Sequence, residues 1–177
     1  MAFVDPVGGI SSDGLPMRPD EKIATGLADN NFDLLKGSRF RGPKGIVFIL
    51  VESAGTYTTN SGACWKWTNT DEFIVRQTEA AGTEYAVGVS AENLPDLLAG
   101  DYFLIQAPDQ EGAVIRMRSS AAISAGALVE PTTVGEIVTD ASGTATETLG
   151  VALEAATGAD ELIAVGCYLD GFRGAWA

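Results

Sequence analysis

The sequence predicts an all-β protein, an antiparallel barrel or sandwich of short strands that follows an extended N-terminal arm. From Ile46 onward, apolar runs of strand length recur about every ten residues, with Gly, Asp, Ser and Thr between them. The chain has 21 glycines and only 8% aromatic residues, which favours tight turns and closely spaced backbones. Residues 1–45 show neither a helical nor a strand period.

Residues 1–45 are predicted to be an arm that becomes ordered against a partner, because large apolar side chains are scattered among turn-forming residues. Phe32, Leu34 and Leu35 lie just before Lys36, where the basic segment begins. The prolines of the arm are Pro6, Pro16, Pro19 and Pro43.

Residues 46–177 are predicted to form the β body. Residues 91–100 could make one short helical turn, which Pro95 would limit. The predicted strands lie within 46–55, 56–62, 63–68, 72–78, 85–90, 100–108, 112–120, 127–133, 135–143, 148–156 and 161–172.

Two segments of the body resemble each other. Residues 85–105 and 148–169 both contain a strand with Gly-Val, a loop of small residues, and an apolar strand. The body is therefore either two related modules, about 46–118 and 119–177, or one body in which a single kind of hairpin recurs.

The charge is unevenly distributed along the chain. Residues 1–45 contain six Lys/Arg and six Asp/Glu, whereas residues 46–177 contain five and eighteen and so carry the whole net charge of −13. Such an acidic body is not expected to bind nucleic acid directly, because phosphate contacts require a basic face. No apolar run reaches the length of a membrane helix, and we expect no membrane partner.

Catalytic motifs are absent from the sequence, and histidine is absent altogether. The usual general base and metal ligand are therefore missing, and we expect no enzymatic activity, cofactor or metal. Cys64 and Cys167 are too far apart for a CxxC motif. They are either buried thiols that act as small apolar side chains, which we favour, or a disulfide if the fold brings them together.

A basic segment joins the arm to the body. Lys36, Arg39, Arg41 and Lys44 lie within nine residues that contain no acid. This segment is either a solvated linker or a contact with an acidic partner surface, including that of a neighbouring copy. We favour the contact.

Aromatic residues suggest two further contacts. Trp65 and Trp67 share one face of a predicted strand, as core or interface residues or, less favoured, as a stacking platform for a sugar. Phe172 and Trp176 lie in a polar C-terminal segment, where they would either anchor it to a neighbouring surface or pack onto their own body.

Residues 55–172 resemble the small β-barrel decoration (cement) proteins of tailed-bacteriophage capsids, of the DUF2190-like family. The resemblance is carried by GDYFLIQ at 100–106, ISAGALVEP at 123–131 and GVALEAA at 150–156, and by Gly171. It implies homotrimers that bind the major capsid protein on the outer surface of the virion. The long N-terminal arm and Phe103-Leu104, where an aromatic such as Trp is common, depart from the family pattern.

We therefore expect a head decoration protein, made in the host cytoplasm, that stabilises the contacts between coat-protein capsomers. The candidate contact residues are Lys36, Arg39, Arg41, Lys44, Phe32, Leu34, Phe172 and Trp176. One alternative is a major coat or tail-tube subunit, although the chain is short for a coat protein. The other is a carbohydrate-binding domain that uses Trp65 and Trp67.

Overall fold

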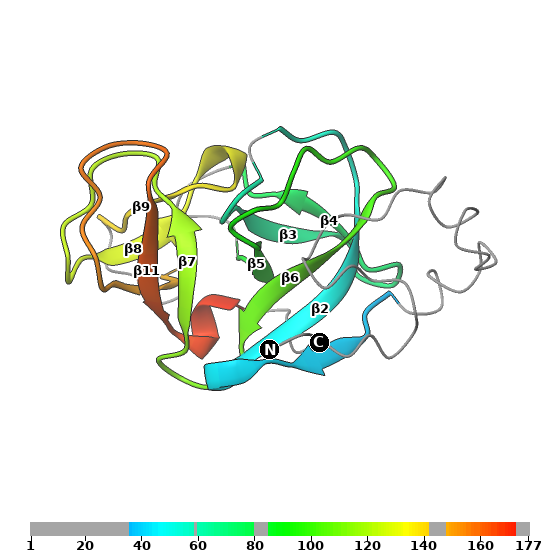
Figure 1. Ribbon diagram of the computed structural model, residues 1–177, viewed down its shortest axis with the longest axis horizontal. Coiled ribbons are helices and arrows are strands. Elements are labelled where there is room, and N and C mark those ends of the chain that lie inside the picture. The colour runs from blue at the N-terminus through cyan, green and yellow to red at the C-terminus, as the bar shows by residue number, and fades with distance from the viewer. Residues whose placement is uncertain (1–35, 59, 80–84, 142–147, 173–177) are drawn as a thin grey trace.

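The structure is a computed structural model that describes residues 36–58, 60–79, 85–141 and 148–172. The predicted all-β class is confirmed. The described residues form eleven strands in two sheets, joined by turns that include three short 3-10 segments. Figure 1 shows the two sheets side by side, with the five-stranded sheet on the left.

The first sheet is built around β2 (Ile46–Ser53), whose long apolar sequence suits a strand that is covered on both faces. One edge of β2 pairs with β6 (Tyr102–Pro108), from Ile46 opposite Pro108 to Glu52 opposite Tyr102. Its other edge pairs with two strands in succession, β1 (Arg39–Arg41) and then β4 (Ile74–Gln77).

The remaining strands of this sheet are β3 (Cys64–Asn69) and β5 (Gly88–Ser90), which give the order β1-β2-β4-β3-β5-β6. The β2–β6 pairing closes this sheet on itself. The β2–β4 pair is parallel, so the sheet is not antiparallel throughout as the sequence suggested.

The second sheet is antiparallel and has the strand order β7-β11-β10-β8-β9. A bridge between Ser119 and Ile137 brings the end of β7 next to β9. The strands are β7 (Val114–Arg118), β8 (Leu128–Pro131), β9 (Ile137–Thr139), β10 (Gly150–Ala152) and β11 (Leu162–Cys167).

One hydrophobic core joins the two sheets. Trp65 of β3 lies at its centre, with its ring 4.7 Å from the ring of Phe103 and 5.1 Å from that of Tyr57. The same cluster includes Ile115 and Val165 of the second sheet. The chain passes from one sheet to the other between Pro108 and Val114, but the apolar interior is continuous.

The two similar sequence segments form the same kind of strand pair. β5 pairs with β6 and β10 pairs with β11, both antiparallel. Each intervening loop also makes an isolated bridge, Leu97 with Tyr57 in the first sheet and Ala156 with Ile123 in the second. The likeness seen in the sequence thus corresponds to a recurring hairpin with a bridged loop.

The folded sheet begins before Ile46. β1 lies within the range assigned to the arm, and it is antiparallel to β2, with Phe40 opposite Phe48. The 3-10 segment η1 (Pro43–Gly45) turns the chain between the two strands, η2 (Thr133–Gly135) does the same between β8 and β9, and η3 (Leu169–Phe172) follows β11.

Candidate interaction surface

Three basic side chains lie together at the start of the first sheet, and we call Arg39, Arg41 and Lys44 the basic edge. Because side chains alternate along a strand, Arg39 and Arg41 share the exposed side of β1, while Phe40 is turned away and half-buried. β1 pairs only with β2 among the described strands, so it lies at an edge of the sheet.

Lys44 is held at the tip of the β1–β2 turn. Its φ and ψ angles are 57° and 35°, and Gly45 follows with a φ of 74°. Two left-handed residues in succession are typical of a type I′ turn, which suits the twist of the flanking strands. The backbone therefore directs the Lys44 side chain into solvent beside the strand that bears the two arginines.

Lys36 is not part of this exposed group, contrary to its prediction as a partner contact. Its Nζ lies 2.8 Å from Glu52 Oε2, and its side chain is only 13% exposed. The ammonium group also lies 5.9 Å from the centre of the Tyr102 ring. Strands β2 and β6 supply these two neighbours, so Lys36 forms an internal ion pair.

The positive charge of Arg41 is only weakly compensated. Arg41 Nε lies 3.5 Å from Asp109 Oδ2, but the arginine side chain is 88% exposed. An ion pair this exposed is screened by water and contributes little to stability. Three exposed basic residues therefore lie at this edge of a chain whose net charge is −13.

Of the four apolar residues predicted as partner contacts, the structure describes one. Phe172 is completely buried in the core, at the end of η3, so it is not a surface anchor. The alternative that the sequence left open, packing onto its own body, is the one observed. Phe32, Leu34 and Trp176 lie outside the described residues.

The proposed aromatic platform is not formed. Trp65 is fully buried, and its indole Nε1 has no hydrogen-bond partner in the described structure. Trp67 is partly buried and makes an edge-on contact with Phe73, with 5.9 Å between ring centres. The two rings cannot stack together on a sugar, which removes the basis for the carbohydrate-binding alternative.

Both cysteines are buried free thiols, as favoured from the sequence. Burial is the main cause that raises the pKa of Cys64 far above its ordinary value, and it raises the pKa of Cys167 to about 12. The thiols are therefore protonated at neutral pH and behave as core side chains. In the described residues no group of three or more His, Cys, Asp or Glu could hold a metal ion.

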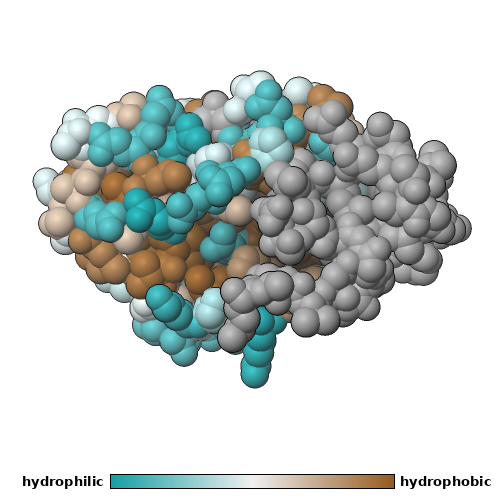
Figure 2. Space-filling view, viewed as in Figure 1, coloured by the Kyte–Doolittle hydropathy of each residue, from teal (hydrophilic) through white to brown (hydrophobic). Residues whose placement is uncertain are grey.

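A second surface was not identified from the sequence. We call Val114, Val151, Leu153, Ala164 and Gly166 the outer face, because they lie on the solvent side of strands β7, β11 and β10 or directly beside it. Figure 2 shows the apolar surface that covers the front of β7 and β11. Alternation in VIRMR places Val114 on the exposed side with Arg116, but the local sequence does not reveal that β10 and β11 place further small and apolar residues beside it.

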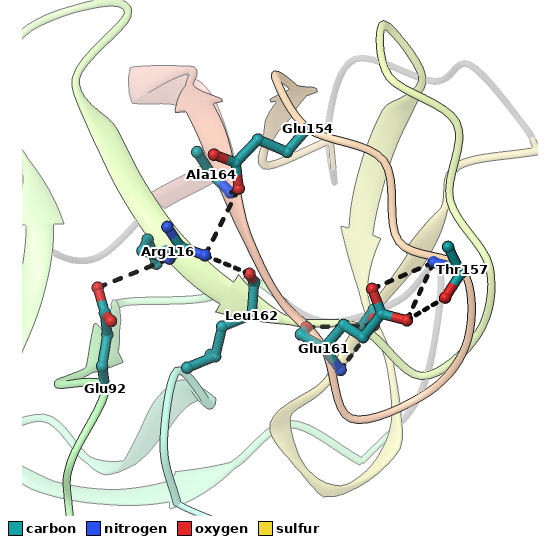
Figure 3. Close-up of polar contacts among 8 residues, drawn as sticks. Glu92, Arg116, Glu154, Thr157, Glu161, Leu162 and Ala164 are labelled. Carbon is teal, nitrogen blue, oxygen red and sulfur yellow. Dashed lines mark hydrogen bonds and ion pairs between the residues drawn. The ribbon is translucent and has the colours of Figure 1, made fainter.

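Arg116 crosses this surface. Its guanidinium lies 3.7 Å from Glu92 and 3.5 Å from Glu154, and its Nη2 donates a hydrogen bond to the Leu162 carbonyl at 2.6 Å (Figure 3). Glu92 belongs to the loop before β6, and Glu154 belongs to the loop after β10. One arginine of β7 thus contacts loops from both sheets.

Comparison with known proteins gives information about the fold. No protein-family model matches the chain, and no curated protein matches it. In the part of the chain that the structure describes, no helix is long and apolar enough to cross a membrane. Among solved structures, the N base of the head fibre protein gp8.5 of bacteriophage phi29 aligns with a TM-score of 0.52 and 12% sequence identity, covering 70% of this chain and 95% of that one. At this identity the likeness establishes that the two proteins share a fold.

Proposed function

We propose that the protein is a structural component of a bacteriophage head that binds the outer surface of the capsid and stabilises contacts between coat-protein capsomers. The observation that carries this proposal is the shared fold with the base of a phage head fibre, 95% of which is covered by the alignment. The sequence resemblance to capsid decoration proteins, over residues 55–172, supports it independently. We expect no catalysis.

The basic edge is the surface that we assign to the capsid. It is a local positive strip on an acidic protein, so it favours an acidic partner surface while the rest of the body repels one. This arrangement favours an orientation in which the basic edge faces the partner. The proposed partner is the major capsid protein.

Repetition would strengthen such contacts. A homotrimer would present three basic edges to one capsid, and linked weak contacts bind far more tightly than each contact alone. In this scheme residues 1–35, with their scattered apolar side chains, add contacts beyond those of the basic edge.

The test is binding of purified protein to DNA-filled heads that lack it, measured by co-sedimentation at several salt concentrations. The variant Arg39→Gln/Arg41→Gln should bind at least about tenfold more weakly at low salt, because two charges that favour encounter and docking are removed. The difference in affinity between the variant and the unmodified protein should narrow as the salt concentration rises, since salt screens exposed charges.

A matched variant controls for the change in net charge. Lys66→Gln/Arg76→Gln also removes two positive charges from strands of the first sheet, where the two residues are cross-strand partners. It should bind almost as well as the unmodified protein. If both variants lose binding equally, net charge and not the basic edge is responsible. If the unmodified protein does not bind heads at all, the proposed function is wrong.

A further inference from the structure

The outer face has the wrong polarity for a sheet surface that only meets water. In β11, Ile163, Val165 and Cys167 point into the core, so Ala164 and Gly166 are on the opposite side. An antiparallel sheet with one buried face normally places polar side chains on the other. Beside the arginines of β7, the solvent side here carries small and apolar residues, and 53% of Leu153 and 43% of Val114 are exposed.

The register of the strands makes these residues contiguous. Gly166 pairs with Val151 of β10 on one side and with Val114 of β7 on the other, so the three form one row across the sheet. Ala164 lies in the next row, opposite Arg116. The Leu153 side chain covers Gly166, with its Cδ2 3.6 Å from the position that a Cβ would occupy. The centre of the outer face is therefore apolar, and its middle strand contributes only the small residues Ala164 and Gly166.

Charged groups of both signs surround this centre, and they include Glu92 of the loop before β6. β7 supplies Arg116 and Arg118, and the connection between β10 and β11 supplies Glu154 and Asp160. Arg116 pairs with Glu154, and Arg118 Nη1 lies 3.1 Å from Asp160 Oδ1. Figure 3 shows Arg116 between acidic side chains on either side. The rim therefore mixes the two signs of charge, with each arginine beside acidic side chains of neighbouring loops.

We infer that the outer face is a contact surface for a second copy of this chain. A purely acidic or purely basic partner would be repelled by part of this mixed rim. A second copy carries the same mixture of charges, so in a two-fold arrangement the arginines of each copy can lie beside acidic side chains of the other. An apolar centre with a polar rim that contains arginine is the usual composition of a protein interface.

The arginines of the outer rim also reduce an obstacle to self-association. Two chains with a net charge of −13 repel each other over most of their surfaces. They can approach where arginines offset the acids, and among the described residues of the second sheet the Lys/Arg residues are Arg116 and Arg118. This inference does not depend on the proposed function, because self-association can be measured without capsids.

The test is sedimentation velocity of the full-length protein over a range of concentrations. The unmodified chain should form dimers or larger assemblies at micromolar concentration. Leu153→Glu should raise the dissociation constant at least about tenfold, because it places a charge in the apolar centre of the contact. Val114→Lys, at an independent position of the same row, should act in the same direction.

The matched control is Leu98→Glu, since Leu98 is 46% exposed but lies in the loop before β6 and not on the outer face. It should leave the dissociation constant unchanged within about twofold, and circular dichroism should show that all three variants are folded. A monomeric unmodified chain at about 100 µM would overturn the inference. Equal weakening of self-association by Leu98→Glu and Leu153→Glu would also overturn it. So would an effect of Leu153→Glu on head binding without any effect on self-association.

Discussion

The two sheets contain the same hairpin turn in different surroundings. In the first sheet, Lys44 and Gly45 have φ angles of 57° and 74°; in the second, Val134 and Gly135 have 52° and 74°. A backbone hydrogen bond flanks each turn, and it is 2.8 Å long in the first, from Gly42 N–H to the Ile46 carbonyl. It is 2.7 Å in the other, from Thr132 N–H to the Glu136 carbonyl.

The surroundings of the two turns differ. A Cβ on Gly45 would meet the flexible side chain of Gln110, whereas a Cβ on Gly135 would lie 2.8 Å from the Ala63 Cβ and 3.0 Å from the Cys64 carbonyl oxygen. Gly135 N–H also donates to the Thr78 carbonyl at 3.2 Å. The first turn therefore presents a charge to solvent, and the second turn fastens one sheet to the other.

This comparison predicts that the two sheets unfold together. Each contributes one cysteine to the shared core, and both thiols have raised pKa values because of burial. A thiol reagent at pH 8 should label the native protein at least about a thousandfold more slowly than the urea-unfolded chain, with both thiols reacting at the same rate. Labelling of one thiol well before the other would show that one sheet opens independently.

The same shifts determine the effect of alkaline pH. Above the ordinary thiol pKa of about 8.5, the unfolded chain loses thiol protons that the folded chain retains. Stability should therefore be fully present below that pH and should fall as the pH rises toward the folded pKa of Cys167, about 12. Urea denaturation between pH 7 and 10 measures this.

The largest difference in stability should separate the two turn glycines. Gly45→Ala should cost about 1–2 kcal/mol, because an alanine is strained in the left-handed conformation. Gly135→Ala should cost at least about 1 kcal/mol more, since the new methyl group also presses on the Cys64 backbone, which cannot move aside as a side chain can. Urea denaturation of both variants gives the comparison, and equal costs would mean that the second turn is not held tightly.

Removing the Thr78 hydroxyl, which holds the second turn, should also destabilise the protein. Thr78 is fully buried, and its Oγ1 donates to the Thr132 carbonyl at 2.8 Å. Thr78→Val should cost about 1–3 kcal/mol, because it leaves a carbonyl of the turn without this donor. Ser120→Ala is the control, since its hydroxyl donates to Ile137 O, which also accepts the Ser120 N–H. Ser120→Ala should therefore lower the free energy of unfolding by less than Thr78→Val does.

Replacing Val134 should give the smallest change, and it should be favourable. A β-branched residue is rarely found in the left-handed conformation. Because Val134 is 51% exposed, burial of its side chain contributes little to stability. Val134→Asn should stabilise the protein by about 0.5–1 kcal/mol, because asparagine tolerates this conformation. Thermal unfolding measures the gain. A loss would mean that the valine side chain contributes packing that outweighs the strain.

Much of the β body follows from local sequence. The run from Ile46 to Ser53, the alternation in VIRMR and the apolar sequence of β11 each form the strand expected of them. The parallel pairing of β2 with β4 could not be predicted, because strand alternation specifies which residues share a face and not which strand lies alongside. β1 was assigned to the arm because three residues are too few to show a period.

For the candidate site, too, the sequence determined some features and the tertiary structure determined others. By itself the sequence identified the basic segment, the absence of histidine and two thiols suited to a core. The tertiary structure decided which members of each set reach the surface. The Lys36 side chain is largely buried because Glu52 of β2 and Tyr102 of β6 lie beside it. Phe172 is buried because η3 packs against the core, and the outer face stays exposed because no described element covers it. Burial depends on what the rest of the chain places opposite a residue, and its sequence neighbours do not contain that information.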